Sequence, residues 1–243
     1  MGKASRLKAA KRASSVSVPG IKIRPAVAGD RAVIDELLAA AHTRLNDYIG
    51  KALTDPARST GFGWAIHNKN EFARALQTGP EEASYSLTTL LVAENDANEV
   101  VGCVHAGPAE HVMDTALAQV PRQDRMGTAI SAFLGLVKLH GISVRPDHRG
   151  RGIAAALLRQ VIGSYTRAKR LLMYGQFKTT EDLGDFYRGQ GFHVATAGTS
   201  LSTRAIFHPN DVVLTHEPGY RLFYRDLALP RDTSWERRPG VGR

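Results

Sequence analysis

The chain contains a single cysteine, Cys103, among its 243 residues. One cysteine excludes an intramolecular disulfide and a zinc cluster built from several cysteines. Cys103 lies in an apolar run typical of a strand, so we expect a buried, unreactive thiol. The sequence also lacks an apolar run of about 18 residues and an apolar segment behind its N-terminus. These absences predict a cytoplasmic protein with no membrane span and no signal peptide.

Acidic residues are scarce at both ends of the chain. The formal net charge is +9, and the five basic residues of 1–20 together with a net two from 231–243 supply +7 of it. We therefore expect residues 1–20 to form a basic, disordered tail and residues 229–243 a flexible one. If the protein binds nucleic acid, we expect only the basic tail to do so, through unspecific attraction to phosphates. A solvated tail without a ligand is the simpler interpretation of its charge.

Apolar residues make up 43% of the sequence, enough for a sizeable core. Apolar periodicity and turn residues predict the helices 31–41, 64–77, 151–169 and 180–188, and the strands 21–24, 87–94, 100–106, 133–144, 171–177, 192–195, 212–215 and 220–226. Residues 43–63 are expected to form a loop or a broken helix. This order predicts one α/β domain around a mixed sheet over residues 21–228, with an insertion near 108–131.

The segment Arg149-Gly150-Arg151-Gly152-Ile153-Ala154, called the glycine loop below, lies between a strand-like and a helix-like run. Glycines let the backbone approach a ligand closely, and the helix that follows offers unpaired N–H groups and a positive dipole end. This arrangement suits a phosphate group, although a glycine turn without a ligand explains the loop alone equally well. The chain has no Gly-x-Gly-x-x-Gly and no Gly-Lys-Ser/Thr, which argues against Rossmann and Walker nucleotide sites.

Two motifs in order identify a family resemblance. The string from Val144 to Ala154 resembles the acetyl-CoA loop of the GNAT superfamily of N-acetyltransferases. In that family an Arg or Gln is followed by two residues, Gly, one residue, and Gly or Ala; here Arg149, Gly152 and Ala154 fill these places. The later segment 186–192, Phe-Tyr-Arg-Gly-Gln-Gly-Phe, resembles the second signature, an aromatic pair followed by Gly-Phe. The resemblance covers residues 21–227.

The resemblance implies an acetyl-CoA-dependent acyltransferase in which an amine attacks the thioester directly, without an acyl-enzyme and without a metal. It implies that the backbone of Ile142 and Val144 holds the pantetheine arm, and that the Val144 N–H stabilises charge on the carbonyl oxygen. Tyr187 is the implied general acid toward the departing thiolate. The pyrophosphate is expected on the loop residues Arg149, Gly150, Arg151, Gly152, Ile153 and Ala154. Thr180 stands where many members carry Asn; we expect it to cap a helix and contact the cofactor.

The general base is less well marked. A lysine-like amine has a pKa of about 10.4, so a base or a water chain must accept its proton at neutral pH. His140 lies two residues before Ile142 on the expected strand and is our candidate. Glu94 and His105 are rivals at the ends of the expected hairpin. Each of the three is more often structural, so the assignment stays open at this point.

Acceptor choice is expected to depend on residues 43–63, 108–131 and 196–219. Glu110 and Asp114 suit a cationic amine, whereas Arg122 and Arg125 suit an acidic acceptor. We favour an amine on a small molecule. The alternatives are a macromolecular acceptor, either a protein amino group or an aminoacyl-tRNA, and a regulatory domain that binds acyl-CoA without catalysis. Acyl length and oligomeric state stay open.

Overall fold

The structure is a computed structural model that describes residues 18–55, 58, 61–110, 118, 120–208, 210–228 and 235–237. Its main sheet has seven strands in the order β1-β2-β3-β4-β5-β9-β6. The strands are β1 (Ile21–Pro25), β2 (Thr89–Asn95), β3 (Val100–Gly107), β4 (Leu136–Val144), β5 (Leu172–Lys178), β6 (His193–Val194) and β9 (Tyr220–Asp226). All neighbours pair antiparallel except β4 and β5, which are parallel. The expected α/β fold around a mixed sheet is confirmed.

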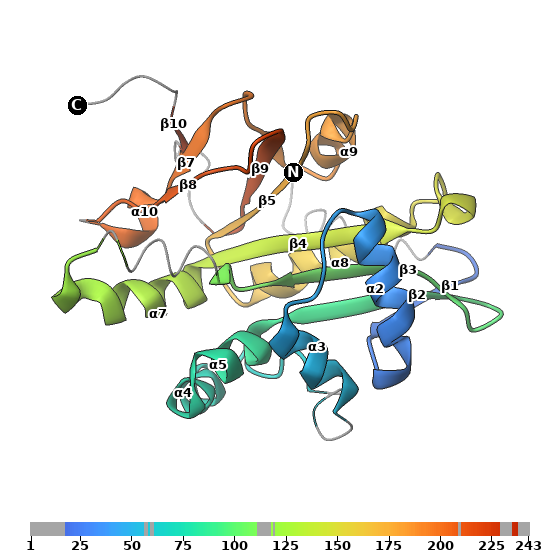
Figure 1. The fold of residues 1–243 in the computed structure, drawn as a ribbon, viewed down its shortest axis with the longest axis horizontal. Helices are drawn as coiled ribbons and strands as arrows, with labels where there is room; N and C mark the ends of the chain where they lie inside the picture. The colour runs from blue at the N-terminus through green and yellow to red at the C-terminus, as the bar shows by residue number, and fades with distance from the viewer. Residues whose placement is uncertain are drawn as a thin grey trace, which may run out of the picture.

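Helices cover both faces of this sheet (Figure 1). On one face, α8 (Ile153–Arg167) packs against β2, β3 and β4. On the other face lie α2 (Arg31–Ala40) and α3 (Asp47–Thr54), while α5 (Pro80–Leu87) contributes buried residues to the clusters on both sides. The remaining helices are α4 (Lys69–Thr78), α7 (Arg125–Gly135), α9 (Gly184–Gly189) and α10 (Arg204–Phe207). Among the described residues, one core forms on each side of the central strands, and a third apolar cluster lies around β9, β7 (Ser200–Ser202) and β8 (Val213–Leu214).

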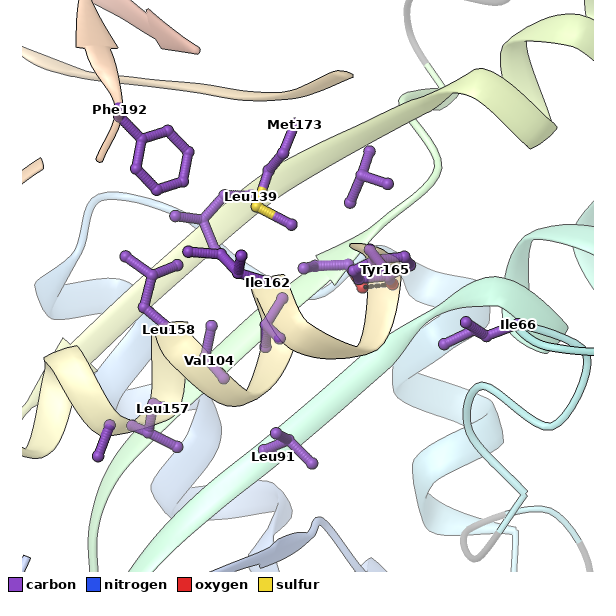
Figure 2. Close-up of a cluster of buried hydrophobic side chains, with 14 of the residues drawn as sticks. Ile66, Leu91, Val104, Leu139, Leu157, Leu158, Ile162, Tyr165, Met173 and Phe192 are labelled. Atoms are coloured by element: carbon purple, nitrogen blue, oxygen red, sulfur yellow. Dashed lines mark hydrogen bonds between the residues drawn. The ribbon is translucent and has the colours of Figure 1, made fainter. Parts of the chain in front are cut away.

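The apolar stripe of α8 builds the larger core, as Figure 2 shows. Leu157, Leu158 and Val161 are fully buried against the sheet, as the spacing of the helix predicts. Tyr165 is buried as well, and its hydroxyl lies 2.8 Å and 3.0 Å from the carbonyl oxygens of Leu87 and Ala106. These contacts hold α8 in a fixed position along the sheet. Among the described residues, no helix is long and apolar enough to cross a membrane.

Several expected elements are confirmed with small shifts. The strands at 21–24, 100–106 and 220–226, the helix at 151–169 and the hairpin turn at 95–98 are all present. Asp30 precedes α2, but its carboxylate does not cap that helix. It accepts from the Val27 N–H (2.8 Å) and from Arg24 (2.6 Å) instead. The turn before the helix is therefore held by an ion pair.

Two expected boundaries are wrong, and one helix was not expected. The strand expected over 133–144 begins at Leu136, because Phe133 belongs to α7. The helix expected from Trp64 begins at Lys69, where the Asn68 side chain caps it. A separate helix, α5, follows at once, because Pro80 suits a first helical turn as well as it ends the previous helix. Residues 43–63 contain α3, in agreement with the broken helix that we considered there.

A second sheet of three short strands lies beside the main one, in the order β10-β7-β8. It comprises β7 (Ser200–Ser202), β8 (Val213–Leu214) and β10 (Glu236–Arg237). Trp235 precedes β10 with 0% of its surface exposed, and its indole donates to Asp226 (2.5 Å). The expectation of a flexible tail over 229–243 is therefore wrong for residues 235–237. Most of the tail expected over 1–20 lies outside the described residues.

Candidate active site

The main sheet opens between β4 and β5. The two strands pair only over Leu136–Lys138 and Leu172–Tyr174, and β4 then continues to Val144 with β3 as its one neighbour. The Arg145 N–H donates to the Val101 carbonyl (2.9 Å). Because bonded pairs alternate along an antiparallel ladder, the backbone N–H and C=O groups of Val144 and Ile142 point away from β3, into the gap. A strand edge with free backbone groups therefore lies inside the sheet.

A cavity of about 500 Å³, called the cleft below, fills this gap. One wall is β4 from Leu139 to Val144, and the other comes from β5 and α9. The lining residues outside β4 are Ala40, Ala41, His42, Arg149, Ala154, Gln176, Phe177, Lys178, Glu181, Asp182, Leu183, Phe186, Tyr187 and Tyr220. The His42 imidazole lies 3.3 Å from the Glu181 carboxylate and joins the end of α2 to the segment before α9. The sequence analysis did not predict this pair.

The glycine loop adjoins the cleft through a hollow of about 260 Å³, and Val144, Arg149, Ala154 and Phe186 line both spaces. Gly150 (φ +74°) and Gly152 (φ +82°) adopt the left-handed backbone that favours glycine. A Cβ at either position would meet nothing within 4 Å, so the space in front of the loop is open. The loop can accept a group pressed against its backbone.

Backbone donors converge on this hollow. From Gly150 to Ala154, no backbone N–H has an acceptor in the part of the chain that the structure describes. We expected the Arg149 N–H among them, but it donates to the Pro146 carbonyl (3.3 Å) in the turn that precedes the loop. Five N–H groups therefore remain at the N-terminus of α8, where the helix dipole favours an anion.

The two loop arginines differ in position. The Arg149 side chain donates from Nε to the Val144 carbonyl (3.0 Å), so the guanidinium sits where the cleft and the hollow meet. Arg151 is exposed and lines neither space. Only Arg149 therefore lies within reach of a ligand that occupies both.

Tyr187 lies on α9 and lines the cleft. Its side chain is only 5% exposed, and its ring stacks on Phe223 with centroids 3.7 Å apart. Its hydroxyl has no hydrogen-bond partner among the described residues. Burial raises the pKa of Tyr187, and the nearby Glu181 charge adds to the shift. The phenol is therefore protonated at neutral pH and available as a proton donor.

His140 also lines the cleft, at a β-bulge where β4 carries one residue more than β3. Its Nε2 lies 3.0 Å from the Pro108 carbonyl oxygen, a contact that orients the ring. The ring stacks on His105 with centroids 4.5 Å apart.

The two rivals of His140 lie outside the cleft. His105 is fully buried behind His140, and burial together with the Lys138 charge lowers the pKa of His105 to about 4. It is therefore neutral at pH 7. Glu94 accepts from Arg24 (2.6 Å) and does not line the cleft. Of the three residues that we considered for the base, the structure places only His140 in the cleft.

Thr180 lies elsewhere than expected. It precedes α9 without capping it, because that helix begins at Gly184 after Leu183. The expectation of a helix from Thr180 to Arg188 with Thr180 as its cap is wrong. Thr180 instead lines a separate hollow of about 360 Å³ with Arg188 and Arg221, and it lines neither the cleft nor the space at the glycine loop.

A polar cluster that the sequence did not predict lies behind the cleft. Lys138 on β4 is largely buried, which lowers its pKa, while the charges of Glu217 and Glu110 act in the opposite direction. Glu110 accepts from Asn46 and from Ser84, both at 2.5 Å. The Tyr174 hydroxyl is buried without a partner in the described part of the chain. No local sequence pattern predicts this cluster, because its members come from separate segments of the chain.

Part of the chain is similar to a known protein family. Residues 86–194 match the family described as the acetyltransferase (GNAT) domain. No curated protein sequence matches the chain. Among solved structures, a GNAT superfamily phosphinothricin acetyltransferase from Sinorhizobium meliloti in complex with AcCoA is 19% identical, with a TM-score of 0.48 over 91% of this chain and 95% of that one.

Two further solved structures are similar. A putative acetyltransferase, yncA, from Salmonella typhimurium with acetyl-CoA is 17% identical, with a TM-score of 0.45 over 87% of this chain and 96% of that one. A ribosomal-protein-alanine N-acetyltransferase from Brucella melitensis is 18% identical, with a TM-score of 0.45 over 85% of this chain and 99% of that one. The matched segment contains the free edge of β4, the glycine loop and Tyr187. Residues 86–194 are therefore similar to the acetyltransferase (GNAT) domain family.

Proposed function

We propose that the protein transfers an acetyl group from acetyl-CoA to the amine of a small molecule. The observation that carries this proposal is the continuous path from the glycine loop to the free edge of β4. Acetyl-CoA has a pyrophosphate at one end and an extended arm with two amides that leads to the thioester. The loop suits the pyrophosphate, and the backbone groups of Ile142 together with the Val144 N–H, which point away from β3, suit the amides of the arm.

The five free N–H groups from Gly150 to Ala154 supply charge-assisted hydrogen bonds to the pyrophosphate. Each such bond contributes about 1.5–3 kcal/mol. Arg149 adds a positive charge at the junction of loop and cleft. The Val144 N–H faces the cleft and stabilises negative charge that develops on the thioester oxygen during attack.

In direct transfer one bond forms and one bond breaks. The amine nitrogen bonds to the carbonyl carbon, and the carbon–sulfur bond breaks. Tyr187 donates its proton to the leaving sulfur and regains one from solvent, a role that its protonated, unpartnered hydroxyl suits. In the described part of the cleft lining no cysteine is present, in keeping with transfer without an acyl-enzyme.

The attacking amine must lose its proton. For a lysine-like amine this costs about 4.6 kcal/mol at pH 7. We assign the role of base to His140, because its ring lines the cleft and an imidazole accepts a proton near neutral pH. The neutral, buried His105 stacks against it and fixes the plane of the ring.

The acceptor is best explained as a cationic small molecule. Glu181 and Asp182 line the cleft, and their carboxylates favour a protonated amine as it approaches. A volume of about 500 Å³ that the acceptor shares with the acyl arm leaves room for a compact molecule. A macromolecular acceptor is the alternative that the basic tail suggested, and that tail lies mostly outside the described residues.

Calorimetric titration tests the cosubstrate first. We expect acetyl-CoA and CoA to bind with micromolar dissociation constants and a control nucleotide, ATP, to bind far more weakly. A panel of amines with detection of the released thiol then tests the acceptor. No binding of either CoA compound contradicts the assignment of the cleft. Turnover with peptides but with no small amine contradicts the assignment of the acceptor.

A further inference from the structure

A second large cavity lies at the opposite end of α8. Its volume is about 660 Å³, and it shares no lining residue with the cleft. We call it the distal cavity; it is lined by Ala65, Ile66, His67, Lys69, Phe72, Ile130, Ser131, Leu134, Gly135, Arg167, Ala168, Lys169, Arg170, Leu171 and Ile206. The 15 residues of α8 span about 22 Å, so the two sites are well separated.

The lining of the distal cavity carries charge of one sign only. Four cations line it, Lys69, Arg167, Lys169 and Arg170, together with the imidazole of His67, and no aspartate or glutamate is among the described lining residues. No carboxylate of the described chain forms an ion pair with these side chains. The charges of Arg167 and Arg170, after burial, lower the pKa of His67. The positive charges are thus close enough to act on one another.

Arg170 is the most informative member of this set. Its side chain is only 4% exposed, and its guanidinium donates to the carbonyl oxygens of Leu134 (3.0 Å) and Ile66 (3.3 Å). Buried arginines normally face a carboxylate, because desolvation of the charge is costly. Two backbone carbonyls offer only partial charges, and burial accordingly lowers the pKa of Arg170. The structure therefore holds a buried cation whose counter-charge the described chain does not supply.

The helix dipole does not account for this excess. The C-terminus of α8 favours a cation, which explains Arg167 in its last turn. Lys69, however, begins α4, where the dipole is positive and repels it. Arg170 follows α8, but its guanidinium donates to carbonyl oxygens outside that helix, those of Leu134 and Ile66. The dipole thus favours the cations at the end of α8 but does not account for Lys69, nor for the absence of a carboxylate beside the buried Arg170.

We propose that the distal cavity binds a small molecule that carries phosphate groups. A single carboxylate leaves most of the positive charge uncompensated, whereas a phosphate or oligophosphate offers two or more negative charges to Lys69, Arg167 and Lys169. Ile66, Phe72 and Leu134 form an apolar floor for the rest of the ligand. The site lies outside the acetyl-transfer cleft, so its occupant is neither acetyl-CoA in the cleft nor the acceptor.

Titration with inorganic tripolyphosphate in phosphate-free buffer tests the proposal. We titrate the protein alone and then in the presence of excess CoA, because the glycine loop also attracts phosphate. We expect a component of binding that CoA does not displace and that weakens as the salt concentration rises. In the double variant Arg167→Gln/Lys169→Gln this component should lose at least tenfold in affinity. Arg159→Gln is the matched control, because Arg159 is exposed on α8 and outside the distal cavity.

The outcomes are distinct. If CoA displaces all tripolyphosphate, or if the double variant binds like the wild type, the proposal is wrong. Both substituted residues are exposed, and circular dichroism confirms that the variant is folded. A single-stranded RNA that binds more tightly than ATP, with the same dependence on Arg167 and Lys169, overturns the assignment to a small molecule. Failure of CoA binding concerns the cleft and leaves the comparison between the variants valid.

Discussion

Replacement of Tyr187 by Phe isolates the proposed acid. The substitution removes only the hydroxyl and keeps the ring that stacks on Phe223 and on Phe177. The hydroxyl has no partner among the described residues, so no hydrogen bond of the folded state is lost. We expect the free energy of unfolding to change by less than about 1 kcal/mol. A large loss of activity then indicates that the hydroxyl takes part in the chemical step.

The expected loss follows from general acid catalysis, which contributes about 10²–10⁴-fold to a rate. This range corresponds to about 2.7–5.5 kcal/mol of transition-state stabilisation. Because the proton moves only when the carbon–sulfur bond breaks, kcat should fall at least about 100-fold while KM for acetyl-CoA stays nearly unchanged. A change in KM alone would instead indicate that the hydroxyl serves ground-state binding.

The assay is steady-state thiol release with an acceptor found in the amine panel, combined with calorimetric titration of acetyl-CoA. Tyr224→Phe is the matched control, because Tyr224 neighbours Phe223 on β9 but its hydroxyl donates to Glu236 (3.2 Å), outside the cleft. A Tyr187→Phe enzyme that keeps more than a third of the wild-type kcat refutes the acid role. Equal losses in both variants point to damage of the aromatic cluster.

Arg149→Ala combined with Gly152→Asp should abolish acetyl-CoA binding in calorimetry, because the carboxylate repels phosphate and Gly152 has φ +82°; unchanged affinity contradicts the role of the loop. His140→Gln should lower kcat at pH 7 and recover as pH approaches the pKa of the amine; a parallel pH profile argues against His140 as base. His105 has a depressed pKa, about 4 against 6.5 unfolded, so its stabilisation is present above pH 6.5 and disappears as pH falls toward 4. Urea titrations should record a loss of about 3 kcal/mol over that range, and His105→Asn should remove the slope.

The parts predicted from sequence are those that local patterns determine. The glycine loop and α8 follow from glycines that need positive φ and from an apolar stripe at helical spacing. The strand over 220–226 was placed without error, because it is short, apolar and bounded by turn residues. Tyr187 was located through its motif, and the structure places it in the cleft.

The parts that were missed depend on distant contacts. Leu87 and Phe133 were assigned to strands because a short apolar run fits a strand or a helix end equally well. Thr180 had the right residue type for a cap, but the chain turns for three more residues before α9 begins. The burial of His105 depends on the helices that cover its face of the sheet. No local sequence pattern shows which helices cover a given face of the sheet.

The free edge of β4 has a consequence for the solubility of the molecule. Unpaired strand edges recruit strands from other chains and are a common start of aggregation. Here the edge lies within the sheet, with β5 and α9 as the facing wall of a narrow cleft. The edge therefore faces another part of the same molecule, and Arg149 already occupies the Val144 carbonyl. The divergence of β4 from β5 thus leaves backbone groups of β4 available to an extended ligand. The facing wall of the cleft shields the same groups from strands of other molecules.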